Sequence, residues 1–195
     1  MKAKEIEMKK IVLSALAATT AFIAMPAAAQ TVTGTVTLTG SVAPKCSVAA
    51  PAGSTFTRAV NFGELSQANG TLRAGLSADF SAGVADVGII CNTATATVTV
   101  TSLPLATATA AAAGYDNSID YTAHVAVSKA GGGTTTVDDD TIPAAGTGPT
   151  AVGAALLNSA TNVHITADNF RTNNATDILV AGSYSGTITI VIAPS

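Results

Sequence analysis

The sequence predicts an all-β protein with an immunoglobulin-like β-sandwich. Three observations favour this class. Short stretches of alternating apolar and polar residues recur along the chain, most clearly over 94–102 (ATATVTVTS) and 184–192 (YSGTITIVI). Turn-forming residues separate such stretches, as at 67–70 (QANG). No stretch has the periodicity of a helix of about ten or more residues.

The chain opens with a targeting segment. Within residues 1–29, two lysines precede an apolar run at 11–25, and a small-residue cleavage site stands before Gln30. This order is typical of a cleaved secretory signal peptide. The apolar run is short for a membrane span of about 20 residues. We therefore expect an exported mature chain from residue 30 onward, with no membrane insertion of that chain.

The composition of residues 30–195 suits one domain with a modest core. This part is rich in Thr, Ala, Gly and Val, and the chain contains no Trp. It carries ten acidic and five basic residues, and the basic ones are scattered. No cluster of positive charge indicates binding to nucleic acid or to an anionic membrane surface.

Two cysteines, Cys46 and Cys91, are present. In an oxidising compartment an even pair predicts a disulfide. Closing this loop would stabilise the fold by about 4 kcal/mol in the chain-entropy model. A metal site or catalytic thiol is disfavoured, because only His124 and His164 are available as further ligands and no close Cys or His spacing occurs.

The elements expected along the chain are short strands separated by turns. We expect strands at 31–40, 44–48, 59–62, 87–91, 94–102, 119–127, 162–166, 176–180 and 184–192, with a weak alternation at 78–81. Residues 104–114 contain four consecutive alanines but many threonines and no charged pairs, which favours an irregular segment. Residues 129–150 are rich in Gly, Thr and Asp and are expected to form a long surface loop or hairpin tip.

No catalytic constellation stands out in the sequence. A nucleophile elbow of the form Gly-x-Ser-x-Gly is absent. The acidic run 138–140 lacks the spaced oxygen ligands and the terminal Glu of a calcium loop, so a solvated acidic loop is expected. His124 and His164 fall in alternating stretches and are expected on the faces of sheets. The sequence therefore predicts a protein that is not an enzyme and needs no cofactor or metal.

Residues 31–40 (TVTGTVTLTG) form an alternating strand with no tight hairpin after it. Threonine occupies every odd position, while Val32, Gly34, Val36 and Leu38 share the other face. A strand carries a row of N–H and C=O groups that must find partners. Such a strand can complete the sheet of another molecule by β-strand addition, and each buried apolar side chain would contribute about 1.5–3 kcal/mol. The alternative is an ordinary first strand of a complete sandwich.

The order of motifs along the chain resembles a known family. The alternating N-terminal stretch is followed by PKCSV at 44–48, by VNFGEL at 60–65, and by a second cysteine after the strand at 87–91. Gly182 begins an alternating C-terminal stretch and has thirteen residues after it. In these features the chain resembles subunits of chaperone–usher pili, including the archaic branch related to spore-coat-U-type domains. It departs from that pattern at Pro194, where the family has an aromatic residue.

The resemblance implies an incomplete, pilin-type sandwich over residues 43–195, with an N-terminal donor strand over 30–42. The donor strand of one subunit would fill a groove beside the C-terminal strand of the next. The implied donor residues are Val32, Gly34, Val36 and Leu38, and the implied groove residues are Gly182, Tyr184, Ile188, Ile190 and Ile192. The glycine in the donor strand is typical of the motif.

The function implied is that of a structural subunit of a surface pilus, or fimbria, polymerised by donor-strand exchange and supporting adhesion or biofilm formation. Its partners would be copies of itself or related pilins, a periplasmic chaperone and an outer-membrane usher. The subunit would pass through the periplasm to the cell surface. One alternative is a secreted, self-complemented coat or matrix protein of the same fold. Another is a sugar- or calcium-binding β-sandwich that uses residues 129–150. Whether the donor strand serves its own domain or the next subunit stays open.

Overall fold

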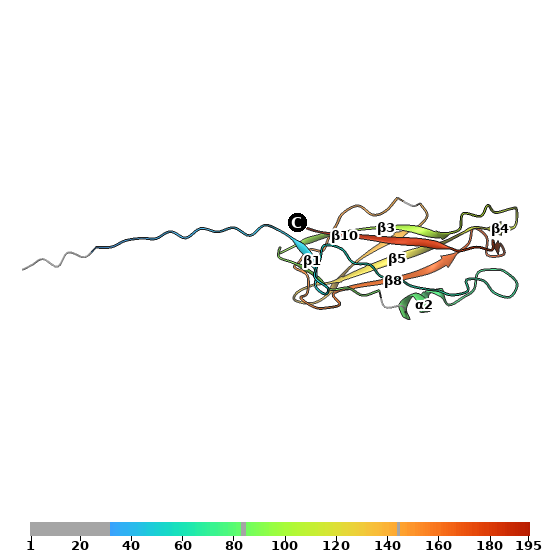
Figure 1. Ribbon diagram of the computed structural model, residues 1–195, viewed down its shortest axis with the longest axis horizontal. Helices are drawn as coiled ribbons and strands as arrows, with labels where there is room; N and C mark the ends of the chain where they lie inside the picture. Colours follow the sequence, from blue (N-terminus) through green and yellow to red (C-terminus); the bar gives the residue numbers. More distant parts are fainter. Residues whose placement is uncertain (1–31, 83–84, 144) are drawn as a thin grey trace, which may run out of the picture. The chain divides into compact units, whose positions relative to one another are not determined.

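The computed structural model describes residues 32–82, 85–143 and 145–195 (Figure 1). The expected signal peptide at residues 1–29 lies outside this described part. Contacts divide the chain into two units, Met1–Ser41 and Val42–Ser195. In the first unit the described residues, 32–41, contain no helix or strand.

The second unit is predominantly β. Its described residues form ten strands and one short helix. These are β1 (Cys46–Val48), α2 (Leu76–Ala82), β2 (Ile89–Cys91), β3 (Ala96–Ala106), β4 (Tyr115–Asp116), β5 (Ser118–Ser128), β6 (Thr134–Asp140), β7 (Thr150–Ala151), β8 (Val163–Arg171), β9 (Ile178–Leu179) and β10 (Ser185–Pro194). In the described chain no helix is long and apolar enough to cross a membrane.

The long strands pair antiparallel in two groups. Strand β10 pairs with β3 along its length, while β5 pairs with β6 on one side and β8 on the other. The groups join where β3 meets β5, opposite Ile119 and Ser118. Figure 1 shows β10 beside β3 and β8 beside β5. Only the short pair of β4 and β9 is parallel among the described strands. The predicted all-β class is confirmed, and the arrangement is compatible with a β-sandwich.

The core follows from the alternation of the strands. Several inward positions of β3 and β5 are valines, whose β-branched side chains pack well on a pleated surface. Val98 and Val100 of β3 and Val125 and Val127 of β5 have no exposed surface, and they share one apolar cluster with residues of β8. Threonine and other polar residues occupy most of the positions between them. The predicted strands at 94–102 and 119–127 are thus confirmed.

The long surface loop or hairpin tip predicted at 129–150 is wrong over its acidic part. Residues 134–140 form β6, paired with β5 from Ser128 opposite Thr134 to Thr122 opposite Asp140. Asp139 is buried, and its carboxylate accepts a hydrogen bond of 2.6 Å from the backbone N–H of Ser102 on β3. That bond satisfies a buried charge and links the two strand groups. A run of three aspartates carries no apolar alternation, so the pattern could not reveal it.

Three further expectations are corrected. The weak alternation at 78–81 is part of helix α2, which follows Gly75 and buries Leu76 and Phe80 on one face, four residues apart. The residues expected as a strand at 59–62 form no helix or strand and pair with no strand among the described residues. The C-terminal strand begins at Ser185, not at Gly182.

The predicted disulfide is confirmed. Cys46 and Cys91 lie directly opposite each other in the pair of β1 and β2, and their sulfurs are bonded at 2.01 Å. Their Cα atoms are 4.1 Å apart. The bond therefore fixes the start of the second unit to the strand that leads into β3.

Candidate functional site: an open groove beside the C-terminal strand

Strand β10 has one paired edge and one open edge. Its pairing with β3 runs from Ser185 opposite Ala106 to Pro194 opposite Ala96. No other strand in the described ranges pairs with β10. Because an antiparallel pair uses only every second residue of each strand, the open edge presents its own row of N–H and C=O groups.

The isoleucines of β10 are only partly covered. Ile188, Ile190 and Ile192 pack against the core but stay half-buried. Their cross-strand neighbours on β3, such as Val98 and Val100, have no exposed surface. The apolar face of the sheet therefore remains incompletely covered at its β10 edge.

A second open backbone row borders the same region. Residues 55–62, which we call the wall segment, form no helix or strand. Phe56, Val60 and Phe62 of this segment pack against the core and are partly buried. Across the described chain, no backbone-to-backbone hydrogen bond involves residues 55–62. The backbone of the wall segment therefore lacks backbone partners, as the open edge of β10 does.

A cavity of about 350 Å³ lies between β10 and the wall segment. Its floor is aromatic: the ring centroids of Phe62 and Phe170 are 5.5 Å apart, and those of Tyr121 and Phe170 are 5.4 Å apart. Residues 186–190 of β10 and Ile165 of β8 also line the cavity. The space is apolar at its base and open above, as a groove for an extended chain must be.

A second, more polar cavity of about 910 Å³ continues the groove. It is bordered by residues 58–66 and 179–186. The two cavities share lining residues, including Arg58, Phe62 and Gly186. Together they form one groove that follows the chain from Leu179 to Ile190.

Tyr121 holds the floor of the groove in place. Its hydroxyl lies 2.9 Å from the carbonyl oxygen of Leu103 and 3.1 Å from that of Thr187, so it bridges β3 and β10. Burial, and then the charge of Asp139, raises the pKa of Tyr121 to about 12. The hydroxyl therefore remains protonated and acts as a structural donor.

At Gly186 the backbones of β10 and β3 approach closely, which the sequence analysis did not predict. A Cβ atom there would lie 2.8 Å from the carbonyl oxygen of Pro104, and the register with β3 shifts between Ser185 and Thr187. A glycine inside an alternating strand is the sequence signal for such a bulge. Gly182, which the sequence did single out, lies outside the strand, with Thr107 close to where its Cβ would be.

The predicted groove residues fall on one side of this groove. Ile188 and Ile190 line the apolar cavity, and Gly182 and Tyr184 line the polar one. Ile192 packs on the core beyond the lining residues. The Tyr184 hydroxyl lies 2.9 Å from the carbonyl oxygen of Val180 and so fixes the turn before β10.

The predicted donor residues are exposed. The side chains of Val32, Val36 and Leu38 are 95%, 85% and 90% exposed. Gly34 has no neighbouring atom within 4 Å of where its Cβ would be. Three large apolar side chains on one face of an extended segment are thus available for burial.

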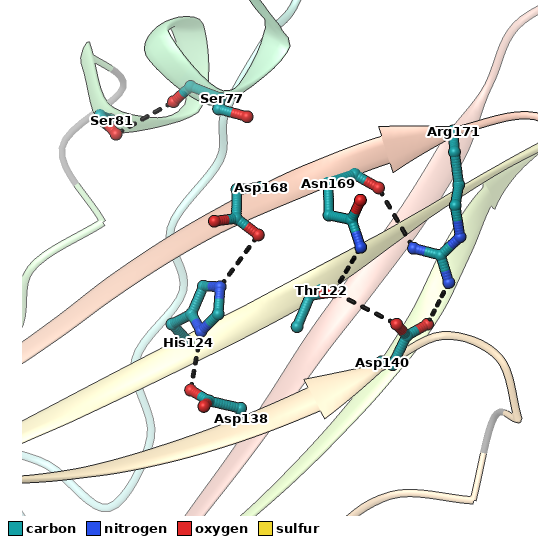
Figure 2. Close-up of polar contacts among 9 residues, drawn as sticks. All are labelled: Ser77, Ser81, Thr122, His124, Asp138, Asp140, Asp168, Asn169 and Arg171. Carbon is teal, nitrogen blue, oxygen red and sulfur yellow. Dashed lines mark hydrogen bonds and ion pairs between the residues drawn. The ribbon is translucent and has the colours of Figure 1, made fainter.

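A polar cluster lies on the face of the sheet formed by β6, β5 and β8. Figure 2 shows His124 of β5 between Asp138 of β6 and Asp168 of β8. Its ring nitrogens lie 2.7 Å and 3.0 Å from the two carboxylates. Partial burial lowers the pKa of His124, but the hydrogen bonds and charges of both aspartates outweigh it and raise that pKa overall. The cluster therefore ties three strands together through a histidine that readily takes a proton.

Each carboxylate of the acidic run has a partner within the fold. Asp138 contacts His124, and Asp140 accepts a hydrogen bond of 2.6 Å from Arg171 (Figure 2). The described residues contain no group of three or more His, Cys, Asp or Glu side chains placed to hold a metal ion. The run is thus engaged in strand pairing and ion pairs.

Comparisons with protein-family models, with curated proteins and with solved structures give no match for this chain.

Proposed function

We propose that this protein is a structural subunit of a surface pilus that polymerises by donor-strand exchange. In this proposal the second unit is an incomplete immunoglobulin-like sandwich of pilin type. Residues 32–38 of one copy fill the groove of the next copy. The observation that carries the proposal is the groove itself, in which an open edge of β10 faces an unpaired wall segment across an apolar floor.

The N-terminal segment has the chemistry that such a groove requires. Val32, Val36 and Leu38 share one face, and each would contribute about 1.5–3 kcal/mol on burial. The backbone of an inserted strand would pair with both open rows at about 1 kcal/mol net for each hydrogen bond. Ordering the segment opposes this at about 1–2 kcal/mol per residue. The threonines of the opposite face would remain in solvent.

The expected route of the chain is compatible with this role. A disulfide fits an oxidising compartment, and the sequence predicts a cleaved signal peptide. An open strand edge is a hazard for aggregation before assembly. A periplasmic chaperone that lends a strand to the groove, and an outer-membrane usher that exchanges it for the next subunit, would manage that hazard. The assembled pilus would support adhesion or biofilm formation.

The decisive experiment removes the donor and supplies it as a peptide. A chain lacking residues 30–40 should be monomeric, and a synthetic TVTGTVTLTG peptide should bind it and raise its melting temperature. The matched control peptide carries Asp at the positions of Val36 and Leu38, and it should do neither. If the truncated chain is equally stable with and without the first peptide and binds neither, donor-strand exchange is the wrong function.

A further inference from the structure

We propose that Asn92 is a positioning residue that commits the N-terminal segment to the groove of a second copy and keeps it out of its own. This inference rests on the proposed function and adds to it a reason why the N-terminal segment fills the groove of a second copy instead of its own. It concerns Ala43–Lys45, the part of the second unit through which the N-terminal segment is attached. We call these three residues the entry segment.

Asn92 holds the entry segment through three hydrogen bonds. Its Nδ2 donates to the carbonyl oxygen of Ala43 at 2.9 Å, and its Oδ1 accepts from the N–H of Lys45 at 2.7 Å. Its backbone N–H donates to the carbonyl oxygen of Lys45 at 3.1 Å. Because Cys46 lies opposite Cys91, these bonds continue the pairing of β1 and β2 by one further position. The entry segment is thereby held in line with β1.

The entry segment and the end of β10 lie at the same end of the second unit. The N–H of Ser195 donates to the carbonyl oxygen of Thr95 at 3.2 Å, and Thr95 follows Asn92 by three residues. Because Lys45 lies opposite Asn92, Lys45 and Ser195 are level along the sheet to within about 10 Å, the reach of three extended residues. The apolar cavity begins at Ile190 and runs away from this end, toward Gly186.

With the entry segment held, the chain is too short to fill its own apolar cavity. A reversal of direction takes about four residues, which would be 39–42. Residues 36–38 would then run back alongside the entry segment. Val36 and Leu38 would therefore lie before the level of Ser195, outside the groove. Five more residues separate Ser195 from Ile190, so about residue 30 would arrive there. None of the predicted donor side chains would enter the apolar cavity.

Releasing the entry segment changes which residue lies level with Ile190 by about eight positions. The reversal can then occupy 43–46, with Pro44 at the second position of a β-turn, where proline is favoured. Leu38 would arrive level with Ile190, and Gly34 level with Gly186. This shift of about eight residues exceeds the uncertainty of about three residues in how the entry segment aligns with Ser195 along the sheet. The hydrogen bonds of Asn92 thus determine whether the N-terminal segment fills the groove of its own chain or that of another copy.

The test uses the mature chain, residues 30–195, and three variants. Asn92→Ala removes both side-chain hydrogen bonds, and Asn92→Asp keeps only the acceptor for Lys45. Asn174→Ala is the matched control, since this exposed residue on the loop after β8 also loses one side-chain hydrogen bond. Light scattering after size-exclusion chromatography gives the polymer fraction, and amide hydrogen exchange of the monomer fraction reports pairing of residues 32–38.

In wild-type and Asn174→Ala monomers, residues 32–38 should exchange without protection. Asn92→Ala should raise their protection and lower the ratio of polymer to monomer by about fivefold, the effect of roughly 1 kcal/mol from two exposed hydrogen bonds. Asn92→Asp should fall between them. Protected residues 32–38 in wild-type monomers, or an Asn92→Ala chain that behaves as wild type, would overturn the role of Asn92 while polymerisation stands. Absence of polymers in every chain, with no binding of the donor peptide to the truncated chain, would overturn the proposed function itself.

Discussion

Ile190 and Val100 lie directly opposite each other in the pair of β10 and β3, yet Val100 has no exposed surface and Ile190 is half-buried. Directly opposed residues of an antiparallel pair share one face of the sheet. Their different exposure therefore reflects position across the sheet. Val100 has β10 beside it, whereas nothing in the described sheet lies beyond Ile190.

This relationship predicts that Ile190→Ala destabilises the filled groove more than the empty one. In the truncated chain lacking residues 30–40, the substitution should lower the free energy of unfolding by less than about 2 kcal/mol, because the side chain is only partly buried. With saturating donor peptide the loss should reach about 2–5 kcal/mol, as for a core Ile. Urea denaturation of both chains, with and without peptide, measures the difference. Equal losses in the two states would contradict insertion beside Ile190.

The alternation of the N-terminal segment predicts opposite results for neighbouring substitutions. Leu38→Asp would place an unpaired charge in the apolar groove and should abolish polymerisation of the mature chain. Thr37→Asp, one residue away on the solvent face, should leave polymerisation nearly unchanged. Neither should shift the melting temperature of the monomer, because both side chains are exposed there. Light scattering at matched concentrations checks the pair, and equal effects of both substitutions would argue against strand insertion.

The close approach at Gly186 predicts a local intolerance to side chains. Gly186→Ala should destabilise the domain by about 1–3 kcal/mol, because its Cβ would lie 2.8 Å from the Pro104 oxygen. Gly148→Ala is the control, since no atom lies within 4 Å of its Cβ position. That change should be neutral or stabilising by up to about 1 kcal/mol. Thermal unfolding of the two variants gives the comparison, and a neutral Gly186→Ala would mean that the bulge relaxes freely.

His124 predicts a stability that depends on pH. Its pKa is raised in the folded state, so its contribution is fully present below its unfolded pKa of about 6.5 and is lost as pH rises through the folded pKa. His124→Gln should therefore lower the melting temperature more at about pH 5.5 than at about pH 8.5. Asp168→Asn should lower the pKa of His124 in an NMR titration. A penalty for His124→Gln that grows with pH would contradict this assignment.

Alternation of residue types was enough to predict strands β3, β5 and β10. The disulfide was predicted separately, because an even pair of cysteines in a chain expected to be exported favours a bond between Cys46 and Cys91. Alternation failed where burial depends on a specific polar partner. Asp139 is buried because the N–H of Ser102 meets it, and that contact spans 37 residues of sequence.

Only one side of the groove, the one formed by β10, could be predicted from the sequence. Ile188 and Ile190 of β10 could be placed beside it, because their strand alternates clearly. Part of the wall segment, 59–62, was expected to be a strand, but nothing in its residue pattern showed that it would have no strand partner. Asn92 could not be found either, because its role depends on hydrogen bonds to a segment 47 and 49 residues away in sequence.

The bond between Cys46 and Cys91 also has a mechanical consequence for a filament of such subunits. Tension would enter each subunit through its own entry segment and leave through the donor strand of the neighbouring subunit, which lies along β10. At Cys46 the covalent link passes the load directly to Cys91, and five residues later the load reaches β3, the partner of β10. Residues 47–90, which include the wall segment and α2, lie outside this load path. Force that enters through the entry segment would therefore reach β3 and β10 without passing along residues 47–90.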